Sequence, residues 1–313
     1  MILNKLCELE DWQNLGLRDA IRVMSPHMVR AFPDYPDLKE HRKAWEYAQL
    51  FSGLQTLGAL RADAVVLGVA AGHESPLYEL TKHVRWVFAT DIYGAGVFTG
   101  HESDATMLHN PDQFALDSYN RNRLVVQYMD ARDLRFEPET FDIVYCLSSI
   151  EHFGGEPGAR TALLEMQRVM KPGAVLMLTT ECIVNGADPL SIENLELFSP
   201  EALTALLASV PQLKPIEEIS FKISHKTLKH VIPLERAVND GLAGHTEYPH
   251  IVLELSGRQF TSVSVFLRKA GESAAARDAT LPLYEQADSR AAGTKQTLVS
   301  SHRSRRWAGH SRR

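Results

Sequence analysis

Cysteine is scarce in this sequence of 313 residues, and its three cysteines, Cys7, Cys146 and Cys182, lie far apart. None belongs to a Cys-x-x-Cys pair, so the pattern indicates neither a disulfide framework nor a zinc knot. Cys146 and Cys182 stand within apolar segments, as small core residues do. This usage fits a reducing compartment, and we expect a cytoplasmic protein.

Long apolar runs and an excess of basic charge are also missing. No run approaches the roughly 18 residues that a membrane-spanning helix needs, and the segment Met1–Glu8 lacks the pattern of a secretory signal. We therefore expect no membrane span. The formal net charge of -6 disfavours broad electrostatic attraction to DNA or RNA, so nucleic acid is not an expected partner.

No metal-ligand pattern stands out either. His225, His230 and His245 lie in a segment with prolines and glycines that we interpret as an insertion over 225–249. Their spacing fits no standard set of ligands, and histidines scattered in loops are usually solvated. We expect no bound metal.

Strand-like and helix-like segments alternate through the middle of the chain. A helical pattern over 159–170 ends at Lys171-Pro172-Gly173. Continuous apolar strands separated by helices predict a parallel sheet that is covered on both faces. The expected strands are 64–70, 84–90, 124–129, 141–147 and 174–180.

The flanking segments differ from this core. Residues 1–60 have helical spacing and form an expected helical N-terminal extension, and residues 61–270 form the expected main domain. Residues 271–313 are rich in Ala, Ser, Arg and Gly and predict a disordered basic tail, either merely solvated or touching nucleic acid or acidic lipid.

Less regular elements complete the main domain. We expect a helix over 200–209 with Ser199 as its N-cap, a strand over 216–223, and a hairpin from 251–255 and 260–267. The hairpin predicts an antiparallel edge of the sheet.

Two carboxylates follow neighbouring strands of the expected sheet. The first strand runs into a turn of small residues, Gly68–Gly72, and Asp91 ends the second strand about 20 residues later. In nucleotide-binding α/β folds, an acidic residue there binds the ribose hydroxyls. Asp130 ends the third strand and could accept a hydrogen bond from an adenine amino group. The alternative is that Asp91 only caps a turn.

The order of these elements resembles that of the class I S-adenosylmethionine-dependent methyltransferases over residues 63–182, with a continuation to 269. The most specific parts are Phe141–Phe153, which matches the family's Phe-Asp, apolar strand and Glu-His-Phe segment, and Arg168–Leu178, which matches its Lys-Pro-Gly turn. The resemblance implies a Rossmann-like, doubly wound α/β fold with a mostly parallel seven-stranded sheet, and S-adenosylmethionine as cofactor.

The resemblance also implies roles for single residues. Gly68, Ala70 and Gly72 would lie against the methionine part of the cofactor, with Leu147 and Ser148 near its amino group. Asp91 would hold the ribose and Ile92 would pack on the adenine. Asp130 and Ala131 would recognise the adenine edge.

The sequence departs from the family in the first turn. The family usually has an acidic residue where Gly68 stands, and glycines where Ala70 and Glu74 stand. Glu74 is expected to replace the missing carboxylate, or else to be only a favourable first-turn residue of a helix. The changes also leave open a non-catalytic, regulatory relative.

Glu151 and His152 follow the fourth strand, on the side where open α/β sheets bind ligands. We expect His152 to be the base, or to position the acceptor, and Glu151 to orient it or contact the cofactor. The alternative is that the pair only closes the turn.

The acceptor class follows from what comes after the fourth strand. Amino-directed nucleic-acid methyltransferases often carry an Asn/Asp-Pro-Pro-aromatic segment there, and this chain has Leu147–Ile150. We therefore expect methyl transfer to a small-molecule, sugar (glycan) or lipid-linked acceptor, with O-methylation favoured. A nicotinamide-dependent oxidoreductase is the weaker alternative because the G-x-G-x-x-G pattern is absent.

Overall fold

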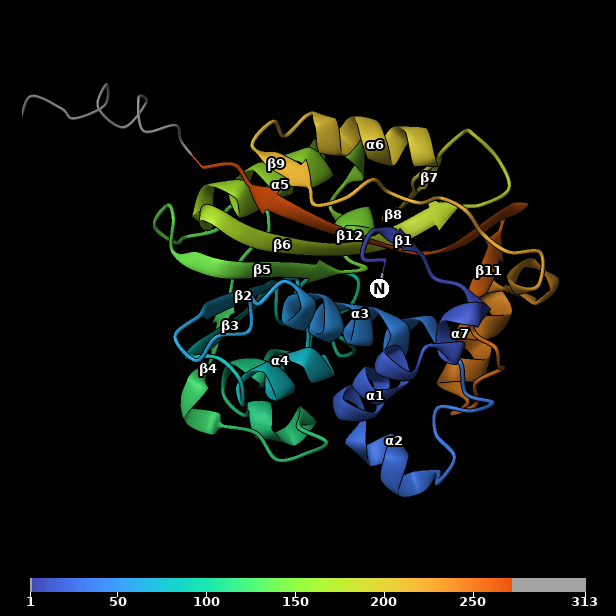
Figure 1. Ribbon diagram of the computed structural model, residues 1–313, viewed down its shortest axis with the longest axis horizontal. Helices are drawn as coiled ribbons and strands as arrows, with labels where there is room; N and C mark the ends of the chain where they lie inside the picture. The colour runs from blue at the N-terminus through green and yellow to red at the C-terminus, as the bar shows by residue number, and fades with distance from the viewer. Residues whose placement is uncertain (1, 272–313) are drawn as a thin grey trace, which may run out of the picture. The chain divides into compact units, whose positions relative to one another are not determined.

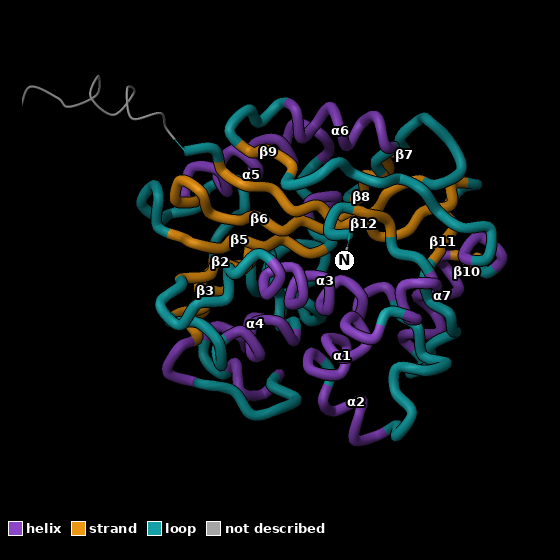
Figure 2. Tube along the Cα trace, in the orientation of Figure 1, coloured by secondary structure: helices purple, strands orange, loops and turns teal. Residues whose placement is uncertain are grey.

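Ten strands within residues 2–271, the part of the chain that the computed structural model describes, form one sheet (Figures 1 and 2). The order β4-β3-β2-β5-β6 is parallel throughout, and β12 runs antiparallel to both β6 and β11. These strands are β2 (Val65–Val69), β3 (Trp86–Asp91), β4 (Leu124–Tyr128), β5 (Phe141–Leu147), β6 (Met170–Ile183), β11 (Val252–Leu255) and β12 (Arg258–Lys269). The five expected parallel strands and the hairpin are confirmed.

The sheet has three more strands than the seven expected, because very short strands leave no periodic signal in a sequence. They are β1 (Lys5–Leu6), β9 (Leu213–Pro215) and β10 (Val231–Pro233). A separate antiparallel pair comprises β7 (Leu190–Ile192) and β8 (Leu195–Leu197).

The strand expected over 216–223 does not form. The edge of β12 that it would use is taken by β1, where Lys5 pairs with Ser264. Ser220 instead exchanges hydrogen bonds with the N-terminal segment, at 2.9 Å from its N–H to the carbonyl of Asn4. The alternation in 216–223 reflects burial of one side, since Ile219 and Phe221 pack against the core.

Helices cover both faces of the sheet, as the doubly wound prediction requires (Figure 1). On β5, Val144 and Cys146 belong to the core beneath α5 and α6, whereas Ile143 and Tyr145 belong to the core beneath α3 and α4. The helices are α1 (Leu15–Met24), α2 (Pro26–Ala31), α3 (Arg42–Thr56), α4 (Ser75–Leu80), α5 (Gly155–Val169), α6 (Pro200–Ala208) and α7 (Leu234–Leu242). The Rossmann-like architecture is therefore confirmed.

Two helix predictions also hold in detail. Ser199 caps α6, accepting the N–H of Ala202 at 3.2 Å, and the expected N-terminal helices exist as α1 to α3. Within residues 2–271 no helix has the length and apolarity to cross a bilayer. The tail predicted over 271–313 lies outside the described part of the chain from residue 272 onward.

The chain order reverses beside β2, which lies between β3 and β5. In open α/β sheets a crevice forms at such a switch point, at the carboxyl ends of the strands. The topology therefore fixes where a ligand site must be sought.

Candidate functional site

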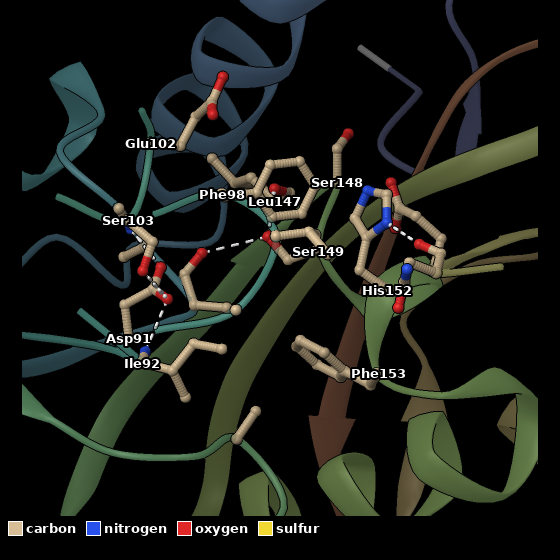
Figure 3. Close-up of a pocket in the computed structure, with 18 of the residues that line it drawn as sticks. Asp91, Ile92, Phe98, Glu102, Ser103, Leu147, Ser148, Ser149, His152 and Phe153 are labelled. Carbon is tan, nitrogen blue, oxygen red and sulfur yellow. Dashed lines mark hydrogen bonds between the residues drawn. The ribbon is translucent and has the colours of Figure 1, made fainter. Parts of the chain in front are cut away.

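A cavity of about 530 Å³ opens at this switch point. Its walls come from the turns after β2, β3, β4 and β5 and from the end of β6. Figure 3 shows Asp91 and Ile92 on one side of it and His152 and Phe153 on the other. All but one of the residues that the sequence singled out line the cavity: Ala70, Gly72, Glu74, Asp91, Ile92, Asp130, Ala131, Leu147, Ser148, Glu151 and His152.

Gly68 is the exception, and its surroundings explain why this chain lacks the family's acidic residue. A Cβ at Gly68 would stand 2.7 Å from the ring of Tyr145, which is fully buried. A side chain there would collide with the core. Gly68 therefore makes room for Tyr145 and does not line the cavity.

The turn after β2 brings backbone to the edge of the cavity. Ala70 and Gly72 both have φ of 48°, in the left-handed region that favours glycine. The N–H of Gly72 donates to Oδ2 of Asp91 at 2.9 Å. The small-residue turn and the acid at the end of the second strand are thus directly joined.

Asp91 is held in a fixed orientation. Its Oδ1 accepts hydrogen bonds from the N–H of Ile92 at 2.7 Å and from the hydroxyl of Ser103 at 3.0 Å. Burial raises the pKa of Asp91, although these donors and Gly72 act in the opposite direction. The carboxylate is a preorganised acceptor for hydroxyl groups of a ligand.

Asp130, at the end of the neighbouring strand, has a partner that the sequence did not suggest. Arg132 donates four hydrogen bonds to it, including Nε to Oδ1 at 2.9 Å, Nη2 to Oδ2 at 2.6 Å and the backbone N–H to Oδ1 at 2.8 Å. The hydrogen bonds from Arg132 lower the pKa of Asp130. Both Asp91 and Asp130 line the same cavity, as expected from their strand positions.

His152 lies on the opposite side of the cavity, and its ring has a defined tautomer. Nδ1 contacts the carbonyl oxygen of Asn194. Because a carbonyl can only accept, Nδ1 carries the proton and Nε2 of the neutral ring carries a lone pair. Burial lowers the pKa of His152, opposed by the Asn194 contact, so the neutral form persists to lower pH.

Glu151 does not orient His152, which corrects one of the two roles expected for it. Its Oε2 accepts the hydroxyl of Thr180 at 2.8 Å, and the side chain is buried. Burial, with the nearby charge of Glu181, raises the pKa of Glu151 to about 8. Asn194, from the loop between β7 and β8, holds the imidazole instead.

Residues 67–178 match the model of the family described as methyltransferase domain. This match covers the strands, the turn and the two carboxylates described above. This segment therefore matches a methyltransferase domain, in line with the resemblance to the class I S-adenosylmethionine-dependent methyltransferases. S-adenosylmethionine is the cofactor that such a domain implies.

Solved structures of low sequence identity also resemble this chain. The [4+2]-cyclase SpnF is 14% identical over 83% of this chain and 98% of its own, with a TM-score of 0.51. The 1,6-didemethyltoxoflavin-N1-methyltransferase of Burkholderia thailandensis is 15% identical over 82% and 92%, with a TM-score of 0.45. The YcgJ protein of Bacillus subtilis is 18% identical over 70% and 98%, at 0.44. At these identities, the similarity to SpnF supports the fold alone.

Several residues that line the cavity lie outside the segment that matches the methyltransferase domain. Arg42 and Lys43, at the start of α3, line the cavity, and Glu46 lies buried behind them. Glu46 accepts the hydroxyls of Ser148 at 2.9 Å and Ser262 at 2.6 Å. Burial would raise the pKa of Glu46, but Lys43, Arg42 and these hydroxyls outweigh it and lower the pKa.

Lys43 connects this helix to the first turn of the methyltransferase domain. Its Nζ lies 2.8 Å from Oε1 of Glu74 and 3.2 Å from Oε2 of Glu46. Oε2 of Glu74 is buried and has no hydrogen-bond partner within the described residues. This free acceptor atom suits the amino group of the cofactor, so the residues present fit the group that the family binds.

These residues were missed for an identifiable reason. A charged residue in a helix is normally assigned to solvent, and only the i, i+4 spacing of Arg42 and Glu46 on an otherwise apolar helix hinted at a buried pair. Glu181 was missed because it stands inside the apolar strand β6.

Proposed function

We propose that this methyltransferase transfers a methyl group from S-adenosylmethionine to a hydroxyl of a small-molecule, sugar or lipid-linked acceptor. One observation carries the proposal. A single cavity has on one side the carboxylate of Asp91, which can accept hydrogen bonds from ribose hydroxyls. On its other side lies the neutral imidazole of His152, whose Nε2 carries a lone pair.

The cofactor's adenosine belongs on the side of Asp91. Asp91 accepts the ribose hydroxyls and Ile92 packs on the adenine ring, while Asp130 and Ala131 recognise the adenine edge. Support comes from the neighbouring positions of Asp91 and Asp130 at the ends of β3 and β4, and from their common cavity.

The methionine part belongs on the turn after β2. Ala70 and Gly72 allow close approach of the backbone, and the free oxygen of Glu74 accepts the amino group. Leu147 and Ser148 line the same cavity. Glu74 thus supplies the carboxylate that Gly68 cannot carry.

The acceptor belongs on the side of His152. S-adenosylmethionine supplies an activated methyl group for an in-line displacement, so the protein chiefly positions the two reactants. Nε2 of His152 accepts the proton that the acceptor hydroxyl releases. Burial keeps the ring neutral and available as a base at neutral pH.

Two measurements test the proposal. Calorimetric titration should detect binding of S-adenosylhomocysteine and no binding of NAD. The substitution Asp91→Asn should weaken the binding of S-adenosylhomocysteine about tenfold or more. Incubation with methyl-labelled S-adenosylmethionine and a small-molecule cell extract should then label one metabolite, by an ether linkage. Absence of cofactor binding would overturn the proposal, and labelling of nitrogen or carbon would overturn O-methylation.

A further inference from the structure

Glu181, near the end of β6, carries an unused hydrogen-bond acceptor inside the cavity. One of its carboxylate oxygens contacts Arg42. The other, Oε2, is buried and has no hydrogen-bond partner among the described residues. The residue is 4% exposed and lines the same cavity as His152. A buried carboxylate oxygen without a donor is costly unless a ligand supplies one.

Carboxyl groups outnumber basic side chains around this side of the cavity. Arg42 lies 3.8 Å from Glu46 as well as contacting Glu181, and Lys43 is shared between Glu46 and Glu74. Within the described chain this buried cluster comprises four carboxyl groups and two cations: Glu46, Glu74, Glu151, Glu181, Arg42 and Lys43. Because burial raises the pKa of Glu151 to about 8, it stays protonated at neutral pH, and three carboxylates face two cations until the sulfonium of the cofactor supplies a third positive charge.

The remaining walls tolerate a cation. Phe98 and Phe153 line this side, and the ring of Phe98 packs edge-on against His152 with centroids 4.9 Å apart. Figure 3 shows Phe98, His152 and Phe153 around the same space. Aromatic faces attract ammonium groups, and a neutral imidazole does not repel them.

We propose that the methyl acceptor carries a protonated amine, which Oε2 of Glu181 holds while a neighbouring hydroxyl faces His152. The acceptor class is therefore a cationic amino alcohol or amino sugar. This rests on the proposed function, because it places the acceptor on the His152 side. An anionic acceptor would add a negative charge to a cluster already rich in carboxyls. A neutral diol would satisfy Oε2 only with a weaker hydrogen bond, because its hydroxyl donor carries no charge.

A labelling experiment tests the class of acceptor. The small-molecule extract is separated by ion exchange at pH 6 into cationic, neutral and anionic fractions, and each is incubated with the protein and methyl-labelled donor. We expect the label in the cationic fraction. Label confined to the neutral or anionic fraction would overturn this inference and leave the methyltransferase proposal intact. Label in no fraction would contradict the proposed function itself.

A binding experiment tests Glu181 without any acceptor. Sinefungin carries an amine where S-adenosylmethionine carries its methyl sulfonium, so it presents an ammonium at the point of transfer. By calorimetry we expect sinefungin to bind at least about tenfold more tightly than S-adenosylhomocysteine, as a charge-assisted hydrogen bond allows. Glu181→Gln should reduce this ratio to near one.

The control removes the same charge from the exposed rim of the same cavity, by Glu102→Gln. It should change the affinity for both ligands alike and keep their ratio. Should Glu181→Gln lower the melting temperature because Arg42 loses its partner, Glu181→Asp retains the charge and should give an intermediate ratio. A wild-type ratio near one, or a ratio unchanged in Glu181→Gln, would overturn the role of Glu181.

Discussion

His152 shows how a single side chain can be prepared for proton transfer by its neighbours. The Asn194 carbonyl selects the tautomer, and burial favours the uncharged ring. Neither effect requires a charged partner, which would raise the pKa and keep the ring protonated.

Replacing His152 with Ala should lower turnover by about 10²- to 10⁴-fold, the usual contribution of a general base. His152→Gln, which can still donate to Asn194, should be equally slow if proton transfer is the role. For the wild type, kcat/KM should fall only below about pH 6.5, the ordinary histidine value, because the pKa is depressed. Steady-state kinetics at several pH values check this, and full activity of His152→Gln would contradict it.

Glu151 predicts a dependence of stability on pH. Its pKa rises from 4.5 to about 8 on folding, so the folded protein keeps a proton that the unfolded chain releases between these values. Stability is therefore lost as pH rises through this window. Glu151→Gln cannot ionise and should be more stable than the wild type by on the order of 2 kcal/mol at pH 9, but not at pH 4.

Urea unfolding at pH 4 and pH 9 measures this difference. Glu156→Gln, on the exposed start of α5, is the matched control and should show no such dependence. An equal effect of Glu151→Gln at both pH values would show that the carboxyl is ionised in the folded protein.

At the scale of elements, α3 joins the N-terminal segment to both the sheet and the cavity. Its buried face carries Glu46 and Gln49 alongside Trp45 and Leu50. Glu46 bonds the turn after β5 through Ser148 and strand β12 through Ser262. Removing one partner would leave the charge of Glu46 buried and unpaired, which costs more free energy than the intact network contributes. The network therefore fixes the start of α3, and with it the position from which Lys43 contacts Glu74.

The other end of α3 is fixed by close packing. A Cβ at Gly53 would lie 2.1 Å from the ring of Phe266 on β12. Gly53→Ala should therefore destabilise the protein by about 1–3 kcal/mol despite the better helix propensity of alanine. Gly241→Ala in α7, where nothing lies within 4 Å, should instead stabilise it by up to about 1 kcal/mol. Thermal unfolding of the two variants tests the contrast, and equal shifts would refute it.

At the scale of the whole described chain, residues 2–271 belong to one compact unit. The cavity draws walls from five parallel strands and from α3, so a bound ligand contacts elements far apart in sequence. A ligand that binds only the native state raises the free energy of unfolding, and the increase grows with the ratio of the free ligand concentration to Kd.

Hydrogen exchange should reveal this coupling. At saturating S-adenosylhomocysteine, amides of Arg42–Glu46 in α3 should exchange more slowly, together with those after β2 and β3. The exposed helix α7, which has no buried residue, serves as the internal control. Protection restricted to the turns after β2 and β3 would show that α3 is not coupled to the ligand.

The sequence by itself determined the parallel core, the edge hairpin and the positions of Asp91, Asp130 and His152. Local pattern suffices there, because a strand's carboxyl end in an α/β sheet always faces the same edge. Only the tertiary structure decided that Gly68 makes room for the ring of Tyr145 and that the carbonyl of Asn194 contacts His152. It also decided that α3 places Arg42 and Lys43 in the wall of the cavity. These contacts join residues distant in the chain, and their energies depend on burial and neighbouring charge, which no local spacing records.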